Sequence, residues 1–126
     1  MANYFVFKVS EEEVYKLRIK SRQAAKLEID LGESPLMAIM RAQSVLEGKE
    51  NPSIEEIMAC IPKVAWFAVV LHASLQAFHH GISKDDVYDI LDRFLENGGS
   101  YYELLEVVME VLMVSNYMPS EAPEAE

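Results

Sequence analysis

The chain has 126 residues, of which 51% are hydrophobic and 25% charged, and its formal net charge is −10. That length is typical of one domain with its own core, and the apolar content excludes a disordered chain. Residues 1–50 carry eight basic and eight acidic groups, whereas residues 51–126 carry three and thirteen. Because a nucleic-acid binder needs cations to displace counterions from phosphates, we do not expect nucleic acid as a partner.

Neither export nor membrane insertion is expected. Residues 1–13 lack the basic region and the apolar stretch of a signal peptide. The most apolar run, Ala59–Phe78, is about as long as a membrane span, but its polar residues favour a core helix. These are Pro62, Lys63, His72, Ser74 and Gln76. The single cysteine, Cys60, lies in an apolar context and is interpreted as a core residue in a reducing cytoplasm.

The first twenty residues predict a β-hairpin, at about residues 3–20. Tyr4–Val9 is aromatic and β-branched, and Glu13–Lys20 alternates strictly between apolar and basic residues, as in a strand with one buried face. The apolar set is Tyr15, Leu17 and Ile19. The basic residues Lys16, Arg18, Lys20, Arg22 and Lys26 form the main cationic cluster, which we interpret as a solvated face. An isolated hairpin is marginal in water, so it must pack on helices or on another chain.

Helix signals follow from Ser21 onward. Ser21 is a candidate N-cap for a helix that ends before Gly32, and Ser34-Pro35 opens a second helix to about Glu47. A capping box at residues 53–56 starts a helix that meets Pro62, and an apolar helix is expected from Lys63 to His80. Further caps at residues 83–86 and 100–103 open helices to about residues 96 and 115.

The predicted fold is therefore mainly α: a compact bundle of about five helices with an N-terminal hairpin, as a single domain over residues 1–118. Residues 119–126 (PSEAPEAE) are Pro- and Glu-rich, and we expect a disordered acidic tail there.

The last helix has more apolar surface than one core contact requires. Glu103, Glu106 and Glu110 share a narrow stripe, which leaves an apolar arc of roughly 240°, against about 100° for an ordinary surface helix. Either this helix is central and its neighbours surround it, or part of the arc binds protein. On the second interpretation, the protein-binding residues are Leu105, Val108, Met109, Leu112 and Met113, with Trp66 and Phe67 of the apolar helix.

No pattern in the chain predicts catalysis, a cofactor or a metal. His72 and His79 are seven residues apart, too far along a helix to ligate one tetrahedral metal, and neither has a cysteine or carboxylate three or four residues away. The acidic cluster Asp85–Asp92 lacks the spacing of a calcium loop, and Gly98-Gly99 lacks the Lys-Ser/Thr of a phosphate-binding loop. We therefore expect a protein that is not an enzyme and that acts by binding other protein.

The order of these motifs carries a family resemblance. KLEIDLGESPL (residues 26–36) is followed by LHASLQAFHHGISKDDVYDILDRFLENGGSYYELLEVVMEVL (residues 71–112) and by SNYM (residues 115–118). This series, over about residues 3–118, resembles the tail assembly chaperones of siphoviruses and related prophages. Asn116-Tyr117 departs from the Gly-aromatic ending common in that family.

The resemblance implies a non-structural protein of the bacterial host cytoplasm that is absent from the mature virion. Such chaperones bind the tape measure protein, assist assembly of the tail tube protein around it and often form homo-oligomers; the family has no catalytic residues to transfer. Two alternatives share the same helices: a homo-oligomeric minor structural or completion protein of the tail, and a small helical regulatory adapter.

Overall fold

The computed structural model describes residues 3–48 and 50–117 of the chain. These residues form strands β1 (Phe5–Ser10) and β2 (Glu13–Leu17) and helices α1 (Ser21–Leu31), α2 (Pro35–Glu47), α3 (Ile54–Cys60), α4 (Val64–Leu75), α5 (Lys84–Glu96) and α6 (Tyr101–Val114). The mainly helical fold with an N-terminal hairpin is therefore confirmed. The tail expected over residues 119–126 lies outside the described residues.

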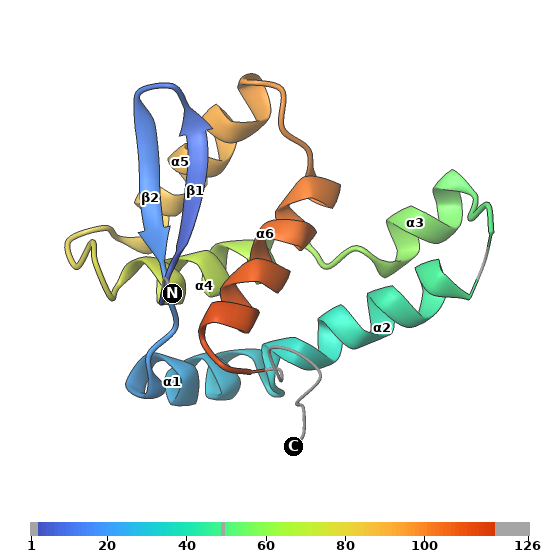
Figure 1. The fold of residues 1–126 in the computed structure, drawn as a ribbon, viewed down its shortest axis with the longest axis horizontal. Coiled ribbons are helices and arrows are strands. Elements are labelled where there is room, and N and C mark those ends of the chain that lie inside the picture. The colour runs from blue at the N-terminus through green and yellow to red at the C-terminus, as the bar shows by residue number, and fades with distance from the viewer. Residues whose placement is uncertain (1–2, 49, 118–126) are drawn as a thin grey trace, which may run out of the picture.

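Helix α4 is the centre of the core (Figure 1). Seven of its residues are buried: Phe67, Ala68, Val70, Leu71, Ala73, Ser74 and Leu75. Helices α1, α5 and α6 and strand β2 all contact it. The hydroxyl of Ser74 donates to the Val70 carbonyl at 2.7 Å, so this buried polar group is satisfied inside the helix.

The hairpin buries the face that its alternation predicts. Strands β1 and β2 are antiparallel, with Phe5 opposite Leu17 and Phe7 opposite Tyr15. Phe7 and Leu17 are both buried, at 2% and 0% exposure, and they join the helical core. The sheet has two strands within the described residues, so α4, α5 and α6 supply the packing that an isolated hairpin lacks.

Two side chains of the basic cluster have structural roles. Arg18 Nη1 donates to the Asn3 and Val114 carbonyls at 2.8 and 2.7 Å, and so joins the N-terminal segment to the end of α6. The ammonium of Lys16 lies 4.9 Å from the ring centroid of Tyr4 and 5.8 Å from that of Phe78. The prediction of a purely solvated face was therefore incomplete.

An ion pair fastens the hairpin to α5. Arg93 donates to both carboxylate oxygens of Glu13, at 2.8 and 2.7 Å, and the Tyr15 hydroxyl donates to Glu13 at 2.5 Å. The Arg93 bond holds the pKa of Glu13 below its usual value, although partial burial opposes this shift.

Two helix ends differ from the prediction. Lys20, not Ser21, is the N-cap of α1, and its side chain makes no capping bond. Helix α4 ends at Leu75 rather than at His80 before Gly81. The cause is local: the Gln76 amide donates to the His72 and Ile82 carbonyls, both at 3.1 Å, and so joins the last turn of α4 to the loop that precedes α5.

The residues beyond α4 hold the hairpin. His79 Nε2 accepts the Lys16 backbone N–H at 3.1 Å, and its ring packs on Tyr15 with centroids 5.2 Å apart. Burial, then the positive charges of Lys16 and His80, lower the pKa of His79. Because Nε2 must be unprotonated to accept this bond, a lowered pKa suits the position.

The turn between α5 and α6 depends on two glycines. Gly98 has a φ of 99°, which a side chain would strain. A Cβ on Gly99 would lie 2.4 Å from the Phe94 ring, which itself packs on Phe7. The glycine pair therefore permits a close approach of the backbone to the core, and Ser100 then caps α6.

Helices α2 and α3 project from the rest of the molecule as an arm (Figure 1). Helix α3 buries none of its residues, and α2 is its main contact. A bend of 49° separates α3 from α4 at the break that contains Pro62, where a kink or break was predicted. The expected compact bundle therefore carries an extension that the sequence did not indicate.

We predict that Phe67→Ala will lower the free energy of unfolding by about 3–5 kcal/mol, because Phe67 is fully buried at the centre of the core. Met58→Ala, on the exposed face of α3, should change it by less than about 0.5 kcal/mol. Urea denaturation followed by circular dichroism measures both. Equal losses for the two variants would contradict the central position of α4.

We also predict that Arg93→Gln will remove a pH-dependent part of the stability. Because the pKa of Glu13 is lowered in the folded state, its contribution is present above the unfolded value of 4.5 and is lost as pH falls through the folded pKa. The wild type should therefore exceed Arg93→Gln near neutral pH, and the difference should shrink in acid. The lowered pKa values of Asp86 and His79 are common to both proteins, so they cancel in the difference in stability. Arg22→Gln, at an exposed position of α1, is the control.

Candidate protein-binding groove

The residues proposed as a binding surface are divided between core and surface. Phe67, Val108 and Leu112 are 0% exposed and Leu105 is 5% exposed, so these four side chains stabilise the monomer's own core. The first interpretation of the last helix, that its neighbours surround it, therefore describes most of α6. Trp66 and Met109 are half-buried, and Met113 is 37% exposed.

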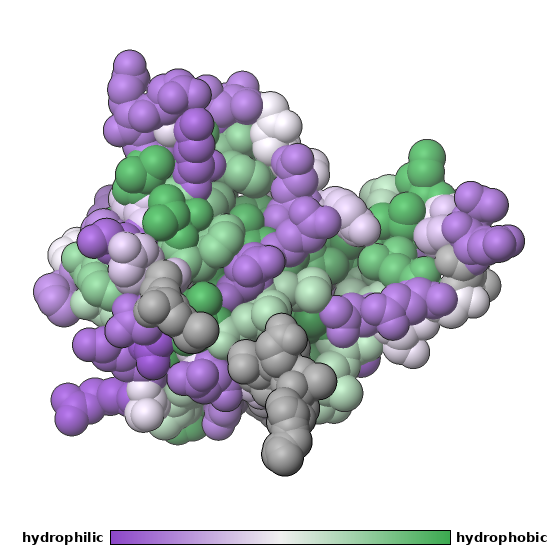
Figure 2. Space-filling model, in the orientation of Figure 1, coloured by the Kyte–Doolittle hydropathy of each residue, from purple (hydrophilic) through white to green (hydrophobic). Residues whose placement is uncertain are grey.

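Four exposed apolar side chains lie on the arm, although the most exposed one of the helices, Ile29 at 80%, belongs to α1. Ile54 and Met58 lie one turn apart on α3, at 75% and 68% exposure, and Met37 and Met40 lie one turn apart on α2, at 43% and 51%. Figure 2 shows hydrophobic side chains over this projecting part of the molecule, with hydrophilic residues towards its end. An exposed apolar cluster of this kind marks interaction sites on folded proteins.

A groove of about 510 Å³ runs along the base of the arm. Its walls come from the end of α1, from α2 and α3, from the Ile61–Lys63 connection and from the first half of α4. We call it the arm groove; its apolar lining is Leu31, Ala38, Ala59, Cys60, Ile61, Pro62, Ala65, Trp66 and Val69. A second hollow of about 340 Å³ between α2 and α3 shares Ala59 and Cys60 with it. Volume and lining are those of a site for apolar side chains.

Three charged residues also line the arm groove. Asp30, Arg41 and Lys63 line it beside the apolar residues. Arg41 is held in place by two hydrogen bonds to the Glu33 carboxylate, at 3.1 and 2.6 Å. Apolar residues together with exposed charged residues are also what a protein interface combines in its core and rim.

Trp66 connects the predicted surface with the observed groove. Its ring meets Phe67 edge to face with centroids 5.3 Å apart, so the core orients the indole. Its Nε1–H is buried and has no hydrogen-bond partner among the described residues. Tryptophan is enriched among the residues that contribute most to protein interfaces.

Met109 lines a separate, smaller hollow. About 170 Å³ lies between α2 and α6, with Leu105, Met109 and Tyr102 on one side and Ala42 and Leu46 on the other. The amide of Gln43 reaches the Met109 sulfur at 3.6 Å. This hollow is adjacent to α2 but does not share lining residues with the arm groove.

Within residues 3–48 and 50–117 no group of three or more His, Cys, Asp or Glu side chains is placed to hold a metal ion. Over the same residues no single helix has the length and apolar composition of a membrane span. Helices α3 and α4 have this length and composition only when they are counted together, across the bend between them.

Sequence reasoning missed the arm groove because its walls come from four helices and the connection between α3 and α4. The sequence carries one relevant pattern: Ile54, Ile57 and Met58 follow the i, i+3, i+4 spacing of a single apolar face on the short helix between Pro52 and Pro62. Ile54 and Met58 of that face are exposed in the structure, so the pattern marks an uncovered face of α3 and not the groove itself.

We predict that Ala59→Glu will weaken binding of the neutral apolar dye Nile red by about threefold or more, because it places a carboxylate at the wall of the arm groove. Trp66 is the only tryptophan, so quenching of its emission reports the groove specifically. Ala25→Glu, the same change at an exposed position of α1, is the matched control. An equal effect of both variants would show that the dye binds elsewhere.

No protein-family model, curated protein or solved structure matches this chain. What the groove binds is therefore inferred from its own residues and from the arrangement of its exposed side chains.

Proposed function

We propose that this protein is an assembly chaperone that binds an amphipathic helical segment of a partner protein and keeps it soluble. The observation that carries the proposal is the arm, which exposes Ile54, Met58, Met37 and Met40 and also supplies walls of the apolar arm groove. An amphipathic helix laid in such a groove buries its apolar face, which removes both apolar surfaces from water.

The methionines of the arm suit a partner whose side chains vary along its length. Methionine is unbranched and polarisable, so one surface adapts to several apolar shapes. The short helix α3 adds adaptability, because its own side chains are not committed to the core. The acidic charge of the chain keeps a loaded complex soluble by mutual repulsion.

The specific partner follows from the resemblance to phage tail assembly chaperones. On this proposal the client is the tape measure protein, a long helix-former with an exposed apolar stripe, and the tail tube protein assembles around the complex. The chaperone acts in the bacterial host cytoplasm and is not part of the mature virion. The motifs of residues 26–36 and 71–112 support this assignment.

We predict that Ile54→Glu and Met58→Glu will each reduce the amount of tape measure protein that co-purifies with this chain by about tenfold after co-expression, since each places a charge on the client surface. Their circular dichroism should match the wild type because neither side chain is in the core. Tyr88→Glu, at an exposed position of α5, is the matched control and should retain the client.

Two outcomes would redirect the proposal. Undiminished co-purification with both α3 variants would exclude the arm as the client surface. If the protein without client forms a concentration-dependent oligomer in light scattering that Met58→Glu dissociates, the arm binds a second copy. That result, together with the presence of the protein in purified particles, would favour the homo-oligomeric structural alternative.

A further inference from the structure

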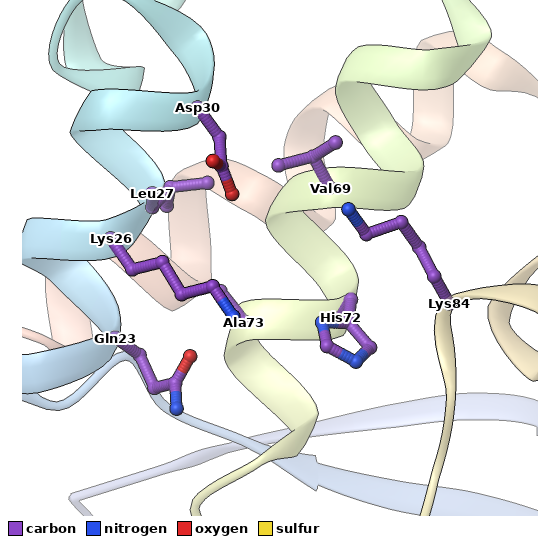
Figure 3. A pocket seen from close by; sticks show the side chains of 8 residues that line it. All are labelled: Gln23, Lys26, Leu27, Asp30, Val69, His72, Ala73 and Lys84. Carbon is purple, nitrogen blue, oxygen red and sulfur yellow. The ribbon is translucent and has the colours of Figure 1, made fainter.

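A small pocket between α1, α4 and the start of α5 gathers three nitrogen-bearing side chains, each from a different helix. Lys26 of α1, His72 of α4 and Lys84 of α5 line it, with the Gln23 amide beside them (Figure 3). Its volume is about 30 Å³, which admits a water molecule or the oxygens of one carboxylate.

The pocket is a positive site on an acidic protein. Neither Lys26 nor Lys84 forms an ion pair with any residue of the described ranges. Burial lowers the pKa of His72, and the charges of Lys84 and then Lys26 lower it further, so both ammonium groups act on the imidazole. Two lysines that line one small pocket with a half-buried imidazole are stabilised by an anion bound there.

Asp30 is the one carboxylate at the pocket, and it stands at the boundary with the arm groove. Asp30 and Val69 line both cavities. Along α4 the groove residue Trp66 is followed by Val69 and then by His72, each three residues on. At about 1.5 Å per residue, the apolar and basic ends of this surface are about 9 Å apart, within the reach of two turns of a bound helix.

We propose that the pocket of Lys26, His72 and Lys84 binds a carboxylate side chain of the same partner segment whose apolar face occupies the arm groove. The partner is thus an amphipathic helix with an aspartate or glutamate about two turns from its apolar anchor. The inference rests on the proposed function for its apolar half; the anion half is testable by itself.

A carboxylate fits better than a phosphate for two reasons. The pocket is too small to enclose a phosphate, and Asp30 at its margin repels a doubly charged anion more than a singly charged one. Because the Asp30 carboxylate also repels a singly charged anion in the pocket, its removal should strengthen acetate binding.

The test follows the ring proton of His72 by NMR in the full chain during titration with sodium acetate at constant ionic strength. Acetate should shift this resonance saturably and raise the pKa of His72, with His79 and His80 as internal references. Lys26→Gln and Lys84→Gln should each weaken acetate binding about threefold to tenfold, and Asp30→Asn should strengthen it by a similar factor. Lys20→Gln, at an exposed position outside the pocket, should leave it unchanged.

Three results would overturn the proposal. One is the absence of a saturable acetate shift, and another is equal weakening by Lys20→Gln, which would indicate general charge screening. Tighter binding of inorganic phosphate than of acetate would assign the pocket to phosphate instead.

Co-purification with the tape measure protein separates this inference from the proposed function. If acetate binds but Lys26→Gln/Lys84→Gln co-purifies as much tape measure protein as the wild type, the pocket is unconnected with the client and the inference fails. If the lysine variants reduce co-purification while Ile54→Glu and Met58→Glu do not, the partner carboxylate binds in the pocket as proposed. The exposed apolar face of the arm is then not the client surface, and that part of the proposed function fails.

Discussion

Helix α4 is apolar on almost every side, and covering it determines where the other elements lie. Helices α1, α5 and α6 and the hairpin pack around it, and Phe67, Leu71 and Leu75 disappear from the surface. Burial on this scale is the main favourable term in folding. Once these elements surround α4, none of them is left to cover the far side of α2 and α3, so the arm stays open and the first turns of α4 form part of its groove.

Polar contacts hold the covering elements in position where apolar packing alone is not directional. Arg18 joins the N-terminal segment to the end of α6, Glu13 and Arg93 join β2 to α5, and His79 accepts a bond from β2. Each joins residues that are more than sixty positions apart in the chain. The hairpin would be marginal by itself, and these bonds hold it against α5 and against the loop after α4.

Local chemistry made much of the fold predictable. The capping boxes at Ser53, Ser83 and Ser100 are all present, and the alternation of Tyr15 and Leu17 identified the buried hairpin face. The prediction failed at the end of α4, where the Gln76 amide donates to the carbonyl of Ile82 in the following loop and the helix does not continue to His80. For the site, periodicity located the apolar arc of α6, but it cannot show which of those side chains other helices of the same chain cover. Only Trp66, of the predicted set, lines the arm groove, whose other walls lie far away in sequence.

The absence of buried residues in α3 has a consequence for motion. Local opening of a segment costs little when few apolar contacts are lost, so α3 belongs to the low-stability end of the domain while α4 follows global unfolding. Backbone amides of α3 would exchange with solvent through such openings. A partner that orders α3 must offset the conformational entropy lost, which weakens affinity per unit of contact area and lets one surface accept successive, non-identical stretches of a long helix.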